Sequence, residues 1–146
     1  YLLIAERPPL TKNNLPYFYN WNDQSKNQVL IANIAFAFLN KRFNNNKKEI
    51  LDKLCKKGIF LLDASYNDKI SEKDRKNALY CDRSYLIKKI ESMIDNKTKI
   101  FIIHNLVEKV IGDILREEFK NVKYIGFPKH YYDQRFKEKI VKITPP

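Results

Sequence analysis

The 146-residue sequence contains few cysteines, histidines and glycines, and each shortage argues against a class of site. Cys55 and Cys81 are the two cysteines, and their spacing argues against a zinc site or a four-cysteine iron–sulfur cluster. With three glycines the chain has neither a GxGxxG nor a GxxxxGKS/T motif, so binding of dinucleotides or nucleoside triphosphates is poorly supported. His104 and His130 lack His-x-x-x-His spacing, and we expect neither a metal nor another cofactor.

The sequence also lacks a long apolar run. Its longest stretch, Val29 to Leu39, is interrupted by Asn33 and is shorter than the ~20 residues that a membrane-spanning helix needs. No signal peptide or membrane anchor is recognisable, and the two cysteines are expected to be reduced thiols. We therefore expect an intracellular protein, cytoplasmic or nucleoid-associated, that does not contact a membrane.

Acidic residues are outnumbered, with 17 Asp and Glu against 28 Lys and Arg, which gives a net charge of +11. The pI is close to 9.6. Such an excess of positive charge favours contact with the phosphate backbone of nucleic acids. The alternative is compositional, because Lys, Asn and Ile are all abundant, as low-GC coding would produce.

Four short apolar runs alternate with helical patterns along the chain. Short continuous apolar runs are typical of strands that are covered on both faces. The alternation predicts an α/β protein, a three-layer α/β/α sandwich with a four-stranded parallel sheet, and the length predicts one domain over residues 1–146, expected to be a monomer. The runs are Leu2 to Ala5, Ile59 to Leu62, Ile100 to Ile103 and Val122 to Phe127.

Capping patterns predict where the helices begin and end. Asp23 or Ser25 is expected to open a helix that residues 44–46 end, and Gly58 is expected to cap a second one. The polar stretch 65–82 predicts a surface flap containing a short helix. Ser84 is expected to open a helix with Tyr85 on its inward face. Asn105 and Glu108 form a capping-box pattern that predicts the start of the next helix, and a last helix is expected from about Asp133.

Polar side chains follow each run, and parallel strands would bring them to one edge of the sheet, where open α/β folds bind ligands. Glu6 is a candidate acid, base or base-reading acceptor, or else an ordinary ion-pair partner of Arg7. Asp63 follows four apolar residues, where a carboxylate is costly unless it is hydrogen-bonded or used, or else it caps the next turn. His130 is a candidate catalytic residue or an exposed loop histidine.

Aromatic and basic residues add candidates for binding. Tyr17 and Phe18 could form a stacking wall for a base, or a hydrophobic lid on the sheet. Lys129 and Arg135 belong to a basic C-terminal region that contacts phosphates or is a solvated helix face. Arg7 is a third candidate for contact with DNA.

These features together resemble the uracil-DNA glycosylase superfamily over most of the chain. Residues 4–9 resemble its first-strand motif, written GQDPY or GEAPG, and residues 58–63 resemble its segment that ends Leu-Leu-Asn. Phe127-Pro128-Lys129 resembles its His-Pro-Ser motif, and Phe18 stands where a family aromatic stacks on the base. The sequence departs from the family at three positions, with Arg7 in place of an Asp, Asp63 in place of an Asn and Phe127 in place of a His.

The resemblance implies a DNA-repair glycosylase that flips a damaged or deaminated base into a pocket and hydrolyses its N-glycosidic bond. Glu6 or Asp63 would supply the carboxylate, Phe18 the stack, and His130 or Lys129 the positive charge near the leaving base. Uracil fits less well, because an ionised Asp63 only accepts hydrogen bonds. The alternatives are a catalytically inactive relative that binds nucleic acid, and a small-molecule enzyme on a flavodoxin-like sheet.

Overall fold

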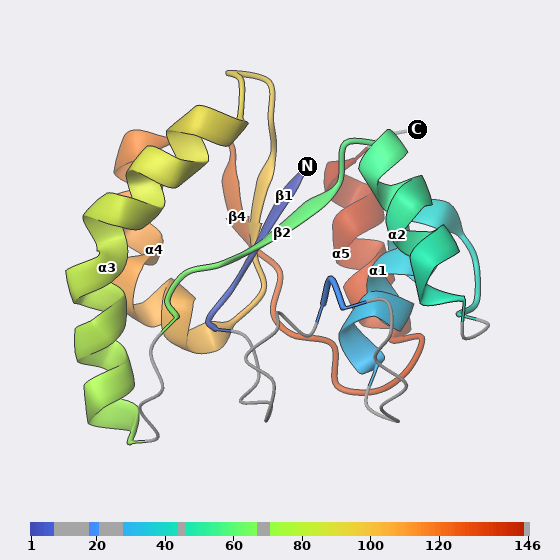
Figure 1. Cartoon of the computed structure of the whole chain (residues 1–146), viewed down its shortest axis with the longest axis horizontal. Helices are drawn as coiled ribbons and strands as arrows, with labels where there is room; N and C mark the ends of the chain where they lie inside the picture. The colour runs from blue at the N-terminus through green and yellow to red at the C-terminus, as the bar shows by residue number, and fades with distance from the viewer. Residues whose placement is uncertain (8–17, 21–27, 44–45, 67–70, 145–146) are drawn as a thin grey trace. The chain divides into compact units, whose positions relative to one another are not determined.

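The computed structural model describes residues 1–7, 18–20, 28–43, 46–66 and 71–144. Within them, each strand is followed by one helix, except that two helices follow the first strand (Figure 1). The strands are β1 (Leu2–Ala5), β2 (Phe60–Asp63), β3 (Ile100–Ile102) and β4 (Val122–Tyr124), and the helices are α1 (Val29–Leu39), α2 (Lys47–Lys56), α3 (Glu72–Met93), α4 (Asn105–Glu118) and α5 (Gln134–Ile143).

The chain forms two compact units. The sheet unit comprises Tyr1–Leu10 and Phe60–Tyr124, and the helical unit comprises Thr11–Ile59 and Ile125–Pro146. All four strands belong to the sheet unit together with α3 and α4, whereas α1, α2 and α5 belong to the helical unit.

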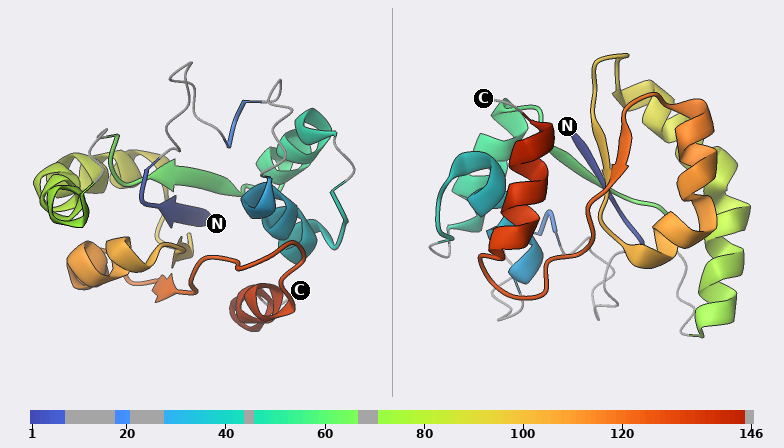
Figure 2. Two further views of the ribbon diagram at one scale, coloured as in Figure 1. Left: turned by 90° about the horizontal axis from the view of Figure 1, so that it is seen from below. Right: turned by 180° about the vertical axis from the view of Figure 1, so that it is seen from behind.

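The four strands form one parallel sheet in the order β2-β1-β3-β4. The arrows of β1 and β2 point the same way in Figure 2, and Ala5 pairs with Asp63 at their carboxyl ends. Leu3, Ile4 and Phe101 are each fully buried, as the continuous apolar runs predict. This confirms the predicted α/β sandwich class with a four-stranded parallel sheet.

Helices α3 and α4 pack on the sheet through one continuous apolar core. Each fully buried aliphatic side chain stabilises the fold by about 1.5–3 kcal/mol relative to an exposed one. The helices contribute Leu79, Leu86, Ile90, Val107, Ile111 and Leu115, and the strands contribute Leu2, Ile4, Leu62, Ile100, Ile102 and Val122. Because α3 follows β2 and α4 follows β3, both helices begin near the carboxyl ends of the strands.

In the helical unit, α1 packs against both α2 and α5. The buried Asn33 explains the polar interruption in this apolar helix. Its amide Nδ2 donates to the carbonyl oxygens of Val29 and His130, each at 2.8 Å, and its Oδ1 accepts from the Asp133 backbone N–H at 2.7 Å. Asp133 in turn caps α5 by accepting from the N–H of Arg135. Asn33 therefore holds the loop that precedes α5.

Several predicted boundaries are wrong. Glu72–Met93 is one helix of 22 residues, so neither a flap with a short helix nor a separate helix opening at Ser84 exists. Ser71 caps this helix by accepting from the Asp74 N–H, and Leu79 anchors it in the core. Tyr85 is 66% exposed rather than inward-facing, because it lies on the flank of this longer helix.

Two further caps differ from the prediction. The cap of α4 is His104, whose side chain accepts from the Leu106 N–H, so Asn105 is already the first helical residue. Helix α1 ends at Leu39 with Asn40 in the left-handed conformation (φ 52°), before residues 44–46. Gly58 follows α2 with φ 68°, which confirms its left-handed turn. Asp23 and Ser25 lie outside the described residues.

None of the helices in the described ranges is sufficiently long and apolar to span a membrane.

Candidate active site at the carboxyl edge of the sheet

The carboxyl ends of three neighbouring strands bring polar side chains together within the sheet unit. Glu6 directly follows β1, Asp63 ends β2, and His104 follows β3 by two residues. The strand order β2-β1-β3-β4 reverses direction between β1 and β3, and open parallel sheets bind ligands at such a switch point. Glu6 and His104 flank this switch point.

Glu6 is buried in an ion pair. Its side chain is 4% exposed. Arg75 of α3 forms a bidentate ion pair with it, with Nε donating to Oε1 at 2.5 Å and Nη2 donating to Oε2. The Nε of Arg7 lies 3.9 Å from Oε1. Burial alone would raise the pKa of Glu6, but the hydrogen bonds from Arg75 and the charges around it outweigh burial and lower that pKa. Glu6 is therefore ionised at neutral pH, and both of its carboxylate oxygens accept hydrogen bonds from Arg75.

His104 can either cap α4 or donate a hydrogen bond to Glu6. Its Nδ1 lies 3.3 Å from the Leu106 N–H nitrogen and 3.3 Å from Oε2 of Glu6. One ring nitrogen cannot both accept from the first and donate to the second. Burial lowers the pKa of His104 and outweighs the opposing effect of Glu6, so the ring is neutral at neutral pH. The tautomer with its proton on Nε2 accepts from Leu106 and caps α4, whereas the tautomer with its proton on Nδ1 donates to Glu6.

Strand pairing continues past the end of β2 and connects Glu6 to a second group of side chains. The Ser65 N–H donates to the Glu6 carbonyl oxygen at 2.9 Å. The Ser65 hydroxyl donates to Oδ2 of Asp82, on α3, at 2.6 Å. Ser65 is 2% exposed; its backbone is fixed by Glu6 and its hydroxyl by Asp82.

Beside Ser65 lies a pocket of about 360 Å³ between the end of β2 and α3. We call it the Asp63 pocket; it is lined by Asp63, Ala64, Ser65, Tyr66, Asp82, Tyr85, Leu86 and Lys89. Tyr66 and Tyr85 are 56% and 66% exposed, and the Lys89 Nζ lies 5.3 Å from the centre of the Tyr66 ring. The pocket therefore combines two carboxylates, one ammonium group and two exposed tyrosines.

Asp63 has the most strongly shifted carboxyl at this edge. Burial raises its pKa to about 6, and the nearby Lys89 ammonium opposes that rise only in part. A carboxyl with this pKa exchanges protons close to neutral pH, which suits a general acid or base. Ring faces and carboxylate acceptors together suit a flat ligand that carries N–H donors, such as a nucleobase.

The predicted site residues divide between the two units. Glu6, Arg7 and Asp63 lie in the sheet unit, where Glu6 and Arg7 are in contact. The others belong to the helical unit. There Phe18 is 8% exposed with the Tyr19 ring 4.9 Å away, His130 Nδ1 lies 3.2 Å from the Tyr131 carbonyl oxygen, and Lys129, His130 and Arg135 are exposed. Tyr17 lies outside the described residues.

The sequence analysis missed the α3 side of the site. Arg75, Asp82 and Lys89 recur every seven residues and share one flank of the helix, with Tyr85 beside them. Dividing this segment into a flap and a shorter helix hid that spacing. An unbroken helical reading from Ser71, with its capping hydroxyl, would have placed these side chains on one flank.

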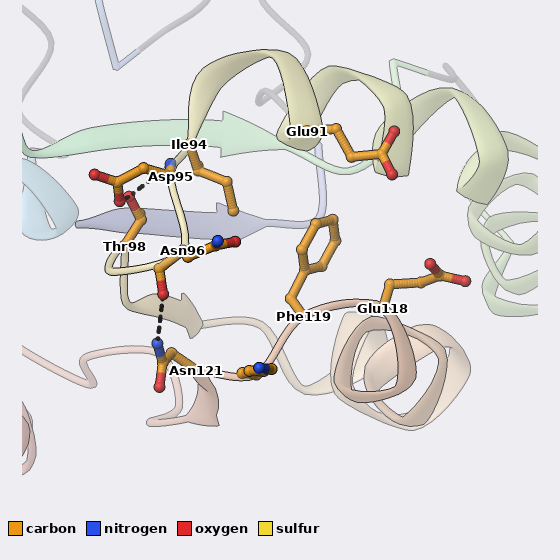
Figure 3. Close-up of a pocket in the computed structure, with 9 residues that line it drawn as sticks. Glu91, Ile94, Asp95, Asn96, Thr98, Glu118, Phe119 and Asn121 are labelled. Carbon is orange, nitrogen blue, oxygen red and sulfur yellow. Dashed lines mark hydrogen bonds between the residues drawn. The ribbon is translucent and has the colours of Figure 1, made fainter.

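A second pocket, of about 290 Å³, lies at the opposite end of α3, beside the turn before β3 (Figure 3). It includes three acidic residues, but Asp95 points toward Thr98, which donates to it at 2.8 Å, and away from Glu91 and Glu118 (Figure 3). Among the described residues, no group of three or more His, Cys, Asp or Glu side chains is placed to hold a metal ion.

Comparisons with models of known protein families, with curated proteins and with solved structures found no match.

Proposed function

We propose that the protein acts on DNA as an N-glycosyl hydrolase and holds an unstacked, altered base in the Asp63 pocket. The observation that carries the proposal is a carboxyl with a pKa of about 6 in a pocket with two exposed tyrosines. The resemblance to the uracil-DNA glycosylases and the net charge of +11 support DNA as the partner.

Asp63 suits the role of general base better than Glu6 does. Arg75 occupies both oxygens of Glu6 and lowers its pKa, whereas Asp63 is half ionised near pH 6. In the proposed step, the oxygen of a water molecule bonds to the sugar C1′ while its proton passes to the Asp63 carboxylate. The N-glycosidic bond breaks, and its electron pair leaves with the base, which then takes up a proton.

The remaining assignments are carried by the resemblance alone. The resemblance assigns Phe18 to the stack on the base, His130 or Lys129 to the negative charge on the leaving base, and Arg7, Lys129 and Arg135 to contact with DNA. Phe18 is 8% exposed, and the exposed tyrosines of the Asp63 pocket itself are Tyr66 and Tyr85. Each is tested by its own variant in the assay below, by replacing Phe18 with Leu, His130 with Gln, or each basic residue with Gln.

The test incubates the protein with single-stranded and duplex oligonucleotides that each carry one uracil, hypoxanthine, xanthine or other altered base, and scores abasic sites after alkali treatment. We expect cleavage of at least one lesion, a rate that rises with pH through about 6 and then levels, and loss of cleavage in Asp63→Asn. Asp113→Asn, which alters a carboxylate that is 98% exposed on α4, is the matched control. Full activity of Asp63→Asn contradicts the proposal.

The buried ion pair of Glu6 favours a second candidate, an inactive relative that binds nucleic acid. If Glu6 is the carboxylate that the reaction needs, Arg75 blocks it. Absence of cleavage across the whole panel, together with salt-sensitive binding of the same oligonucleotides, would establish this candidate instead.

A further inference from the structure

The net positive charge lies mostly in one of the two units. The helical unit carries 14 Lys and Arg against 5 Asp and Glu, a net charge of +9, and the sheet unit carries 14 against 12, a net charge of +2. These charges sum to the +11 of the chain. The two units have the same number of basic residues, so the asymmetry arises because the helical unit has 5 acidic residues and the sheet unit has 12.

Within the helical unit, six basic side chains lie around the C-terminal end of α1. We call them the α1 collar: Lys41, Arg42, Lys53, Lys56, Lys57 and Lys137. Lys137 from α5 donates to Oδ1 of Asn40 at 2.6 Å, and its Nζ lies 4.2 Å from the centre of the Phe36 ring. Lys57 reaches the Phe38 carbonyl oxygen at 3.4 Å.

The other collar members extend this surface. Arg42 lies over the Tyr132 ring at 5.5 Å. Lys53 has a lowered pKa, first because its amino group meets that of Lys41, then because of partial desolvation, and last because of the charges of Lys41 and Lys56. A lowered lysine pKa at an exposed position is a sign of crowded like charges.

Capping of α1 explains only part of the collar. A helix C-terminus carries roughly −0.5 of an elementary charge. The C-terminus of α2 contributes a similar partial charge, Glu49 pairs with Lys53, and Asp52 precedes Lys56 by one helical turn. Six positive charges against about three negative charges leave a surplus of roughly +3, which attracts anions.

The backbone around the collar is fixed in an unusual conformation. Among the described residues, Asn40 and Tyr132 are the two non-glycine residues with positive φ, at 52° and 56°. Tyr132 contacts Phe36 edge to face at 5.6 Å and accepts from the Phe43 N–H at 3.2 Å. An aromatic residue in this conformation is strained, and such strain is concentrated where structure serves binding.

We infer that the α1 collar is a binding surface for the phosphodiester backbone of DNA. The choice of DNA rests on the proposed function, whereas the preference for a polyanion rests on the charges alone. Lysine and arginine side chains replace condensed counterions when they meet phosphates, and the released counterions make binding weaken steeply with salt. The collar thus contributes affinity without reading sequence.

The experiment measures binding of a fluorescent, lesion-free duplex by anisotropy over a series of KCl concentrations. The variant is Lys41→Gln/Lys53→Gln/Lys56→Gln, because glutamine keeps the helix propensity of lysine. The matched control replaces three exposed lysines of the sheet unit, Lys97, Lys120 and Lys123, by glutamine. Circular dichroism and thermal unfolding check that both variants fold.

We expect the collar variant to bind at least tenfold more weakly near 0.1 M salt, with a slope of log K against log salt that is smaller by about 2–3. The control should change both much less. Equal losses in the two variants, or no loss in the collar variant, would overturn the inference, as would stronger binding to anionic lipid vesicles than to DNA at the same salt concentration.

The inference and the proposed function can fail separately. Asp63→Asn is expected to lose cleavage and keep the salt slope, whereas the collar variant is expected to lose slope while a single-turnover assay at saturating protein still shows cleavage. An unchanged slope in the collar variant with cleavage intact contradicts the collar alone. A reduced slope without any cleavage supports the collar and contradicts the hydrolase.

Discussion

Two carboxylates on neighbouring strands, Glu6 and Asp63, have pKa values shifted in opposite directions although burial acts on both. The difference is the partner. Arg75 forms hydrogen bonds with Glu6 and stabilises its charge, whereas Lys89 only moderates the cost of ionising Asp63. One acid is thereby kept ionised and the other is left able to titrate, a division that is common at catalytic sites.

Replacing Asp63 by Asn should stabilise the protein at pH 8. The folded-state pKa of about 6 lies above the ordinary aspartate value of 3.8, so ionised Asp63 destabilises the fold by on the order of 2–3 kcal/mol above pH 6. That cost disappears as pH falls toward 4, and the advantage of the Asn variant should fall below about 1 kcal/mol there. Urea unfolding of both proteins at pH 8 and pH 4 measures the difference. A gain of the same size at both pH values would show that Asp63 does not titrate as described.

Replacing Glu6 by Gln should have the opposite effect. The variant leaves Arg75 without its carboxylate, which costs about 2–4 kcal/mol at pH 7, toward the low end because Arg75 is 25% exposed. The pKa of Glu6 is lowered, so the wild-type advantage is present above the ordinary glutamate value of 4.5 and is lost as pH falls through the lowered pKa. Urea unfolding at pH 7 and below pH 4 measures this loss. A double-mutant cycle with Arg75→Met isolates the pair, and additive single effects would contradict coupling.

At the scale of helices and strands, hydrophobic periodicity was sufficient to predict the elements whose side chains are buried. The four apolar runs became the four parallel strands, and Gly58 took the predicted left-handed turn. Polarity misled at 65–82, because α3 buries a narrow stripe that includes Leu79 and Leu86, and its remaining face is charged. Such a stripe is weak in a short window and becomes clear only over the full 22 residues.

The strand-end residues of the candidate site were predictable, and their long-range partners were not. Strand ends located Glu6 and Asp63 at one edge of the sheet, because parallel strands must end together. The ion pair with Arg75 joins residues 69 positions apart, and no local pattern reveals such a partner. Likewise, Asn33 appeared as an interruption in an apolar helix, and its role became visible only with the loop around His130 and Asp133.

Two glycines should respond to alanine in opposite ways. Gly58 has φ +68°, so Gly58→Ala should destabilise the protein by about 1 kcal/mol although nothing lies within 4 Å of the added Cβ. In Gly112→Ala, the Cβ would meet Oε2 of Glu108 at 2.7 Å, the buried end of a flexible, partly exposed side chain that pairs with Arg116. The gain in helix propensity, up to about 1 kcal/mol, exceeds the cost of moving that pair. Thermal unfolding tests both signs, and a loss above 1 kcal/mol in Gly112→Ala would mean that Glu108 cannot move.

At the scale of the whole molecule, charge and chemistry separate between the units. The sheet unit, with a net charge of +2, contains the titrating carboxyl and its pocket, and the helical unit carries +9. A steep positive field attracts polyanions but also repels itself, so the unit that favours binding loses stability when no anion is present. The helical unit should therefore be the more sensitive of the two to salt.

Raising NaCl from about 20 to 200 mM should stabilise α2 more than the strands, because the Debye length shortens from about 20 to 7 Å. Each like-charged pair one helical turn apart costs a few tenths of a kcal/mol, and Lys53 forms such pairs with Lys56 and Lys57. Native-state hydrogen exchange should thus show α2 amides gaining on the order of 0.5–1 kcal/mol of protection, and β3 amides gaining less. The Lys41→Gln/Lys53→Gln/Lys56→Gln variant should remove most of this gain. Equal gains in α2 and β3, or a gain that survives the substitutions, would show that crowding of these lysines does not limit the stability of the helical unit.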